Sequence, residues 1–459
     1  MIGSIPSNGT VHGSTCGIVL LICGILLLMT PVCAAGATKP RSGAFSILPS
    51  NPYFFQDANG KPVVLVGDYT WGTFSDIDFD YVRFLDSLKS RGLNVARVWL
   101  WWGCEEFPLE ELGNRHIEPY LRTGPGVAND GGPKYDLTKF NPAFFDRLRA
   151  FCQTAKQRGI EIQLMMMDAW MIKSDKLWRL NAYQRDNNIN GVDGDPANTG
   201  VGTDGKRGFC SMGNPKVMEF QKAYIRKVVD TVNGFDNIHY EIANENYYSE
   251  EWELALCDFI KEYEKSKPKQ HLTMRRDLPS HSYVVQKWDP AIVHKGIMEK
   301  RSLRQPLIFD TDWTINNNDD EVRKAMWAAL ASNGHFDYMD DNSLAFRLNK
   351  PYNDKRAKLH KQIDYAAAFM KQIKPWEMTP SDALVKSGTA FAMASETELA
   401  AYLPSGGRVT LDLSSMRGPL KARWYNPLDG KFGKPVAVRA GTTVELTAPD
   451  SSDWALLIE

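Results

Sequence analysis

The sequence lacks three motifs that mark large enzyme classes. It contains no glycine-rich phosphate loop, no His-Glu-x-x-His pair and no Gly-x-Ser-x-Gly elbow, which are signatures of nucleotide hydrolysis, zinc proteolysis and serine hydrolysis. It has no Cys-x-x-Cys pair that would indicate a zinc site. The formal net charge is only -1, which argues against a nucleic acid or an acidic polymer bound by bulk charge. We therefore expect no metal, no cofactor and no nucleic-acid partner.

Basic residues are also absent before the first apolar run, residues 18–29. The run has the length of the hydrophobic region of a secretory signal, and Ala35-Gly36-Ala37 offers a small-residue cleavage site. We interpret residues 1–37 as the signal peptide of a secreted, periplasmic or cell-surface protein, with no stable membrane insertion after cleavage. The missing basic charge leaves an uncleaved anchor as the alternative, but the run is short for a span of about 20 residues.

Cysteine is scarce in the remaining chain. Cys104, Cys152, Cys210 and Cys257 allow three full pairings, and the sequence does not choose among them. Cys152 and Cys257 fall within helical patterns and are predicted core residues. Cys104 and Cys210 lie in loops and could pair in an exported protein.

Strand-like apolar segments alternate with helical patterns from residue 45 to residue 378. Eight alternations predict an α/β protein with a (β/α)8 TIM barrel rather than an open sheet. The predicted strands are residues 63–66, 94–102, 160–167, the first part of 238–246, 271–275, 291–295, 305–313 and 336–339. Capping residues mark helix starts at Asp76 or Asp78, Asn141-Pro142 and Asn214-Pro215. Residues 103–140 and 171–213 are expected to be long loops.

The pattern changes to short alternating strands near residue 381. Turns at Ser405-Gly406-Gly407 and Asp429-Gly430 separate them. The predicted strands are residues 408–413, 420–425, 435–439, 443–446 and 454–458. Residues 381–459 therefore predict a small antiparallel β-sandwich, which packs on the barrel through its last, buried-type strand.

The ends of the predicted barrel strands carry polar and aromatic side chains, and the carboxyl ends of barrel strands are where chemistry takes place. The central stretch is Ile238–Asn246, in which Asn244-Glu245 joins an amide to a carboxylate able to act as a general acid. In the alternative interpretation, Glu245 caps the next helix or pairs with Arg97. Arg97 is a charge amid apolar neighbours and must itself be paired. The predicted substrate-binding residues are Asp68, Trp71, Arg97, Trp101, Trp102, Asp168, Trp170, Asn244 and Trp313.

These features resemble the apiosidase-like glycoside hydrolases of the retaining (β/α)8 clan. The marks are Asn59-Gly60-Lys61-Pro62, Gly67-Asp68, the Asn244-Glu245 pair and the C-terminal runs Trp424-Tyr425-Asn426-Pro427, Asp429-Gly430 and Asp453-Trp454. The C-terminal runs resemble a β-domain whose family label mentions collagen binding. The resemblance implies that Glu245 is the acid/base and that Arg97 braces the catalytic carboxylates.

The sequence departs from these relatives at the seventh strand. The relatives carry a nucleophilic glutamate near its end, whereas this chain has Asp310-Thr311-Asp312. Aspartates also serve glycosidases as nucleophiles. Alternation places Asp310 and Asp312 on the same side of the strand; we prefer Asp312, which lies nearer the mouth, and expect Asp310 to hold Arg97 or a hydroxyl. The shorter aspartate could widen the carboxyl gap and permit inversion.

The sequence thus predicts an exported glycoside hydrolase that acts on an oligo- or polysaccharide through two carboxylates, Glu245 with Asp312 or Asp310. The competing hypothesis is an inactive carbohydrate- or matrix-binding protein on a glycosidase scaffold, and Thr311 is its best support.

Overall fold

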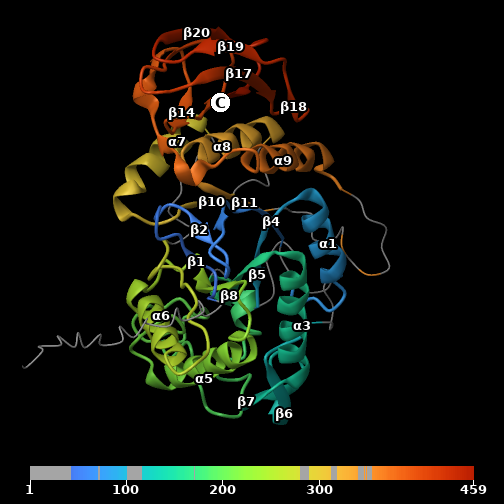
Figure 1. Ribbon diagram of the computed structural model, residues 1–459. Coiled ribbons are helices and arrows are strands. Elements are labelled where there is room, and N and C mark those ends of the chain that lie inside the picture. Colours follow the sequence, from blue (N-terminus) through green and yellow to red (C-terminus); the bar gives the residue numbers. More distant parts are fainter. Residues whose placement is uncertain are drawn as a thin grey trace, which may run out of the picture. The chain divides into compact units, whose positions relative to one another are not determined.

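The computed structural model describes residues 43–70, 73–100, 116–169, 171–279, 289–311, 318–339, 346, 348 and 354–459, and only the backbone of Asp168 (Figure 1). Its central sheet has six parallel strands in the order β10-β11-β4-β5-β8-β9. The strands are β4 (Val66–Tyr69), β5 (Val95–Trp99), β8 (Glu161–Asp168), β9 (Ile238–Asn244), β10 (Ile308–Asp310) and β11 (His335–Met339).

The first barrel strand begins three residues later than the apolar run at 63–66 predicts. The Asn94 side chain accepts from the Val66 amide at 2.9 Å and donates to the Val64 carbonyl at 2.8 Å, so it separates Val63 from β4. Val63 belongs instead to a small antiparallel sheet that precedes β4. Its strands are β1 (Ser46–Ile47), β2 (Phe55–Gln56) and β3 (Pro62–Val63).

The sheet is curled, but a closed eight-stranded barrel is not shown. Beyond β9, Tyr240 forms a single parallel bridge with Thr273, where the fifth strand was predicted. The prediction of a strand at 291–295 is wrong, because these residues lie in helix α7 (Pro290–Lys300). Asp289 caps this helix, accepting from the amides of Ala291 and Ile292, and Pro290 opens it. Within the described residues no strand connects Thr273 to β10.

Capping chemistry explains the other helices that flank the sheet. The Asn-Pro starts predicted at 141–142 and 214–215 are confirmed, and Asn141 and Asn214 accept from backbone amides of the first turn. The first helix is capped by Asp80, not by Asp76 or Asp78, and it ends at Arg91 with Gly92 as its left-handed C-cap. The helices are α1 (Tyr81–Arg91), α3 (Pro142–Arg158), α5 (Pro215–Val232), α6 (Glu250–Glu264), α8 (Asp319–Ala331) and α9 (Ala357–Met370).

The two segments expected to be long loops contain regular structure. The first holds an antiparallel hairpin of β6 (Tyr120–Val127) and β7 (Pro133–Phe140). The second holds the 3-10 turn η1 (Met171–Lys173) and the short helix α4 (Asp175–Trp178). Trp178 is buried against Gly194 and Gly202, where an added Cβ would lie 2.6 and 2.8 Å from the indole. These glycines are therefore required by the packing of the loop on Trp178.

The C-terminal part forms two antiparallel sheets around a shared apolar core, as the sequence predicts. One sheet has the order β12-β14-β15-β21-β17-β18, with β19 also paired to β17, and the other has the order β13-β16-β20. The strands are β12 (Thr379–Pro380), β13 (Val385–Ser387), β14 (Phe391–Ala394), β15 (Leu399–Leu403), β16 (Arg408–Asp412), β17 (Pro419–Asn426), β18 (Lys431–Phe432), β19 (Val436–Arg439), β20 (Thr443–Thr447) and β21 (Trp454–Ile458).

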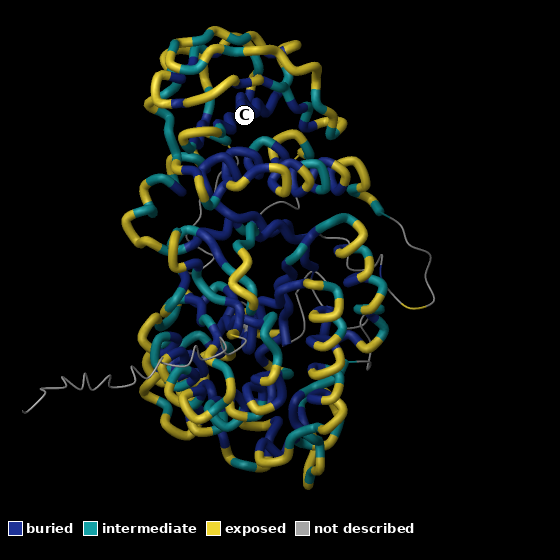
Figure 2. Tube along the Cα trace, viewed as in Figure 1, coloured by how far each residue is buried: buried dark blue, intermediate teal, exposed yellow. Residues whose placement is uncertain are grey.

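The central strands of the larger sheet, β14, β15 and β21, are buried on both faces. In β21, Leu456 and Ile458 enter the core of the sandwich, whereas Ala455 and Leu457 join the core of the barrel helices. Trp327 of α8 stacks on Tyr402 of β15, with ring centroids 5.7 Å apart. Figure 2 shows the buried trace continuing through α8 and α9 into this sheet. The predicted apolar packing of the β-domain on the barrel is confirmed.

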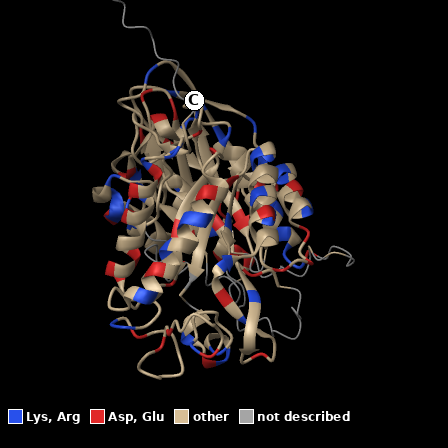
Figure 3. Cartoon of the chain, turned by 90° about the horizontal axis from the view of Figure 1, so that it is seen from below, with Lys and Arg blue, Asp and Glu red and all other residues tan. Residues whose placement is uncertain are grey.

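The described surface mixes both charge signs. In the view of Figure 3, Lys and Arg are interspersed with Asp and Glu around the outer helices. In the ranges given above, no helix is both long and apolar enough to cross a membrane. Cys152 and Cys257 are buried, as expected for core residues; Cys210 is buried too, and Cys104 lies outside the described residues.

A buried ion pair also ties the β-domain to α8. Asp453 is fully buried and accepts from Arg323 Nε at 3.1 Å, from Arg323 Nη2 at 2.7 Å and from the Tyr402 hydroxyl at 3.0 Å. We expect Asp453→Asn to lower the free energy of unfolding by about 3–5 kcal/mol, because it removes the buried counter-charge of Arg323 and leaves only the exposed carboxylate of Asp320 as its partner. Urea unfolding measures this loss. Glu445→Gln, at an exposed pair with Arg408, is the control and should change stability by less than about 1 kcal/mol. Equal effects of the two changes would contradict this role of Asp453.

Candidate active site

Arg97 is a buried cation at the centre of the sheet's inner face. It lies on β5 with a side chain that is 1% exposed. Its Nε and Nη2 donate to the two carboxylate oxygens of Glu241 on β9, at 2.9 and 2.8 Å. Its Nη1 donates to Asp310 Oδ2 on β10 at 3.1 Å, and Nη2 donates to Asn244 Oδ1 at 2.8 Å. One guanidinium therefore connects three strands and two of the predicted site residues.

Glu241 is a member of this cluster that sequence reasoning missed. It is 4% exposed and also accepts from Gln163 Nε2 at 2.9 Å. The signal was present, because a carboxylate in a strand of buried residues needs a cationic partner, and Arg97 was the evident candidate. The expected ion pair of Arg97 is real, and it involves both a structural carboxylate and a candidate catalytic one.

Asp310 has the contacts expected for the deeper of the two aspartates. Its Oδ1 accepts from the Tyr69 hydroxyl at 2.6 Å and its Oδ2 from Arg97. Thr311 points elsewhere: its buried hydroxyl accepts from the Met339 amide of β11 at 2.6 Å. Asp310, the residue before Thr311 and the last of β10, therefore supplies a carboxylate on the inner face. Asp312 lies outside the described residues.

Glu245 follows β9 directly, at the carboxyl end of the sheet. Its backbone φ of +44° lies in the left-handed region, which a residue with a side chain seldom adopts. Its side chain is 18% exposed, so it is neither buried nor free in solvent, and its Oε2 lies 3.5 Å from Lys173 Nζ of η1. The alternative in which Glu245 caps the next helix is wrong, because Ser249 caps α6.

Asp68 does not join the cluster. Neighbouring residues of a strand face opposite sides, and Tyr69 faces inward to Asp310. Asp68 Oδ2 instead lies 2.5 Å from Arg91 Nη1 of α1, on the side where the helices pack. The structure places Asp68 in an ion pair between strand and helix, and its role in positioning substrate stays a prediction.

The structure does not describe the five tryptophans predicted to bind substrate. Trp71, Trp101, Trp102, Trp170 and Trp313 lie outside the described residues, and the side chain of Asp168 is likewise not described. Their assignment to sugar binding stays a prediction. Across the described ranges, no group of three or more His, Cys, Asp or Glu side chains has an arrangement that could hold a metal ion.

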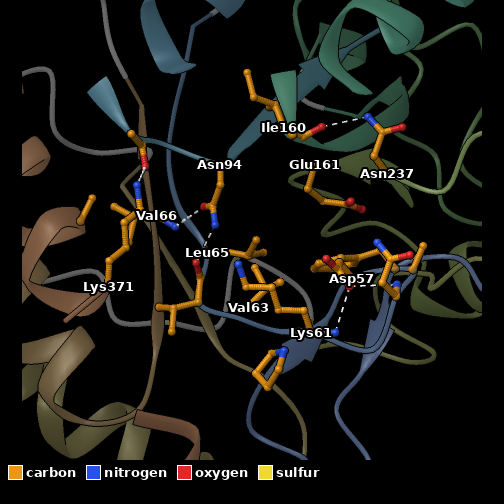
Figure 4. A pocket seen from close by; sticks show the side chains of 18 of the residues that line it. Asp57, Lys61, Val63, Leu65, Val66, Asn94, Ile160, Glu161, Asn237 and Lys371 are labelled. Carbon is orange, nitrogen blue, oxygen red and sulfur yellow. Dashed lines mark hydrogen bonds between the residues drawn. The ribbon is translucent and has the colours of Figure 1, made fainter. Parts of the chain in front are cut away.

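The opposite, amino-terminal edge of the sheet borders a cavity of about 700 Å³ (Figure 4). Glu161 points into it, across from Asp57, and its Oε1 lies 3.2 Å from His239 Nδ1. Burial raises the pKa of the Glu161 carboxyl well above its usual range, and the charge of Asp236 adds to the effect. His239 Nε2 forms a hydrogen bond with Gln163 Oε1, and Gln163 Nε2 donates to Glu241 Oε2. Polar side chains thus run from this edge to Arg97, but the chemistry of such sheets belongs at the other edge.

Comparison with known proteins agrees with this fold. Residues 115–277 match a family described as "Domain of unknown function (DUF6298)", and residues 352–459 match "Putative collagen-binding domain of a collagenase". No curated protein matches the sequence. A solved structure described as "Glycoside hydrolase" is 15% identical with a TM-score of 0.60, covering 91% of this chain and 97% of that chain. A glycoside hydrolase family 5 structure from Bacteroides vulgatus ATCC 8482 is also 15% identical with a TM-score of 0.60, over 91% of this chain and 93% of that chain.

These likenesses show a fold shared with glycoside hydrolases. The C-terminal match agrees with the predicted resemblance of that region to a β-domain labelled for collagen binding. The finer resemblance to apiosidase-like enzymes is not confirmed by any of these matches.

Proposed function

We propose that the chain is a glycoside hydrolase that cleaves O-glycosidic bonds of a polysaccharide or of its side chains. The observation that carries this proposal is the placement of Glu245 at the carboxyl end of β9, directly after an asparagine held by the guanidinium that also binds Asp310. The fold shared with glycoside hydrolases supports it. The predicted export signal and the resemblance to apiosidase-like enzymes suit a polymer outside the cell.

The proposed reaction uses Glu245 as acid and then as base. Glu245 protonates the glycosidic oxygen while a second carboxylate attacks the anomeric carbon, so the bond to the leaving group breaks and a glycosyl ester forms. Glu245 then takes a proton from water, and that water displaces the ester. We assign the attack to Asp312, because both oxygens of Asp310 are engaged by Tyr69 and Arg97. A carboxyl separation well beyond about 5.5 Å would give inversion instead.

The remaining predicted residues would bind and orient the sugar. Asn244 and Asp168 would contact hydroxyl groups, and Arg97 would position the carboxylates. The tryptophans would stack on sugar rings with their apolar faces; they are Trp71, Trp101, Trp102, Trp170 and Trp313.

A carbohydrate- or matrix-binding protein without hydrolytic activity is the second candidate. Thr311 favours it, because a threonine committed to the β11 backbone stands where the resembling enzymes carry their nucleophile. The family description that mentions collagen points in the same direction. Retention of a polysaccharide in affinity electrophoresis without release of sugar would identify this function.

Glu245→Gln should lower turnover of natural glycosides by about 100-fold or more, because it removes the general acid. A substrate whose leaving group needs no proton, such as a dinitrophenyl glycoside, should lose less in its bond-breaking step. Release of reducing sugar measures turnover of the natural glycosides, and pre-steady-state release of phenolate measures bond breaking in the dinitrophenyl glycoside. Glu251→Gln, on the exposed side of α6, is the matched control and should behave as the wild type. Near-normal turnover of natural substrates by Glu245→Gln would refute the assignment.

Asp312→Ala should abolish turnover and regain part of it with azide, yielding a glycosyl azide of inverted anomeric configuration. Azide replaces a missing nucleophile because it is small, anionic and needs no proton removed. Product configuration by NMR measures the outcome. Asp310→Ala should lose activity without rescue, because it leaves Arg97 with one carboxylate fewer. Rescue of Asp310→Ala instead would exchange the two roles, and wild-type turnover in both variants would remove both carboxylates from the mechanism.

A further inference from the structure

The backbone of Glu245 is held in a conformation that its own chemistry does not favour. A left-handed φ at a residue that is not glycine costs of order 1–3 kcal/mol and persists only where the surroundings fix it. Glu245 has a φ of +44°. Its two neighbours in the chain, Asn244 and Asn246, are both nearly buried, at 3% and 5% exposed. The contacts of these two asparagines therefore set where the Glu245 side chain can point.

Asn244 is held from one side by an arginine–glutamate pair. Its Oδ1 accepts from Arg97 Nη2 at 2.8 Å, and Arg97 is itself bound through two nitrogens to Glu241. This pair belongs to the cluster already described.

Asn246 is held from the other side by a second arginine–glutamate pair. Its carbonyl accepts from Arg275 Nη2 at 3.3 Å, and its Nδ2 donates to Glu253 Oε2 at 3.1 Å. Arg275 Nε lies 2.6 Å from the same Glu253 oxygen. Glu253 is 2% exposed, and Arg275 adopts a left-handed φ of +68° that brings it to this position.

The fixed Asn246 side chain then organises the turn into α6. Its Oδ1 accepts from the amides of Tyr248 and Ser249 at 3.2 and 3.3 Å, and its Nδ2 also donates to the Ser249 carbonyl at 2.8 Å. Ser249 caps α6, the helix that carries Glu253. Asn246 and Glu253 therefore connect the start of the turn that follows Glu245 to the helix at its end.

We infer that Arg275 and Glu253 are positioning residues that orient Glu245 by holding Asn246. Arg97 and Glu241 fix the residue that precedes Glu245 in the chain, and Arg275 and Glu253 fix the residue that follows it. The inference rests on the proposed function in one respect: only a catalytic Glu245 makes its orientation matter for turnover. The conformational part stands on the contacts alone.

The charge of Glu253 makes this hold depend on pH. Burial raises its pKa to about 7, opposed by the charge of Arg275 and the hydrogen bond from Asn246, while Glu241 of β9 adds to the rise. The Cys257 thiol, one turn further along α6, also senses the Glu253 charge, and Glu250 lies 3.5 Å from Arg275. Below neutral pH Glu253 is protonated and its attraction for Arg275 weakens. The native carboxyl binds its proton more tightly than the unfolded one, so its contribution to stability is full below about pH 4.5 and is lost as the pH rises to about 7.

Hydrogen exchange of the Tyr248 and Ser249 amides tests the hold without reference to any substrate. We expect Arg275→Ala and Glu253→Gln to exchange these amides at least about tenfold faster than the wild type, with Arg275→Lys intermediate. Arg276→Ala is the matched control, because Arg276 is the next residue and pairs with Asp258 in a more exposed position. Unchanged exchange in both Arg275→Ala and Glu253→Gln would overturn the inference.

Turnover by the same variants tests the consequence for Glu245. We expect kcat to fall at least about tenfold in Arg275→Ala with KM within about threefold, and Glu253→Gln to lose a limb of the kcat–pH profile near neutral pH. Faster exchange with unchanged kcat and an unchanged pH profile would make the pair structural only and overturn the positioning role. A wild type that hydrolyses no glycoside would refute the proposed function, and the exchange result would still decide whether the hold exists.

Discussion

The candidate active site depends on one buried guanidinium, that of Arg97. Arg97 lies inside a sheet whose neighbours are largely apolar, and a cation in that position is tolerated only where carboxylates and hydrogen bonds compensate it. Glu241 and Asp310 supply the charge, while Tyr69, Gln163 and Asn244 complete the hydrogen bonds. Because the partners come from strands far apart in sequence, satisfying Arg97 requires β4, β5, β8, β9 and β10 to be in register. The contacts of the Arg97 charge therefore fix both the curl of the sheet and the position of the candidate active site.

Much of the fold could be predicted because its signals are local. Asn-Pro starts and glycine ends mark α3 and α1, and the short turns mark the C-terminal strands. Failures occurred where distant contacts decide. Asn94 divides an apolar run that reads as one strand, and the strands β14 and β15 escaped notice because both of their faces are buried, so they show no alternation. The missed helix α7 is different: its Asp289-Pro290 start is the same local signal and was overlooked.

The sequence predicts those residues of the candidate site that are neighbours in the chain, and it does not predict most of those that only the fold brings together. Asn244 and Glu245 stand together in the chain, and the need of Arg97 for a partner is visible in its apolar surroundings. That Asp310 holds Arg97 and a hydroxyl was expected from its depth in the strand and is confirmed. Glu253 and Arg275 gave no such signal, because a glutamate on a helix and an arginine beside another arginine read as surface residues.

A double-mutant cycle on Arg97 and Glu241 tests the central claim most directly. The single changes Arg97→Met and Glu241→Gln each leave a buried charge without its main partner, and each should lower the free energy of unfolding by about 3–5 kcal/mol. The double variant should lose clearly less than the sum of the two, with a coupling energy within the roughly 0.5–3 kcal/mol seen for contacting residues. Denaturant unfolding of the four proteins measures it. Additive losses, or single changes that cost less than about 0.5 kcal/mol, would contradict the view that this buried charge organises the site.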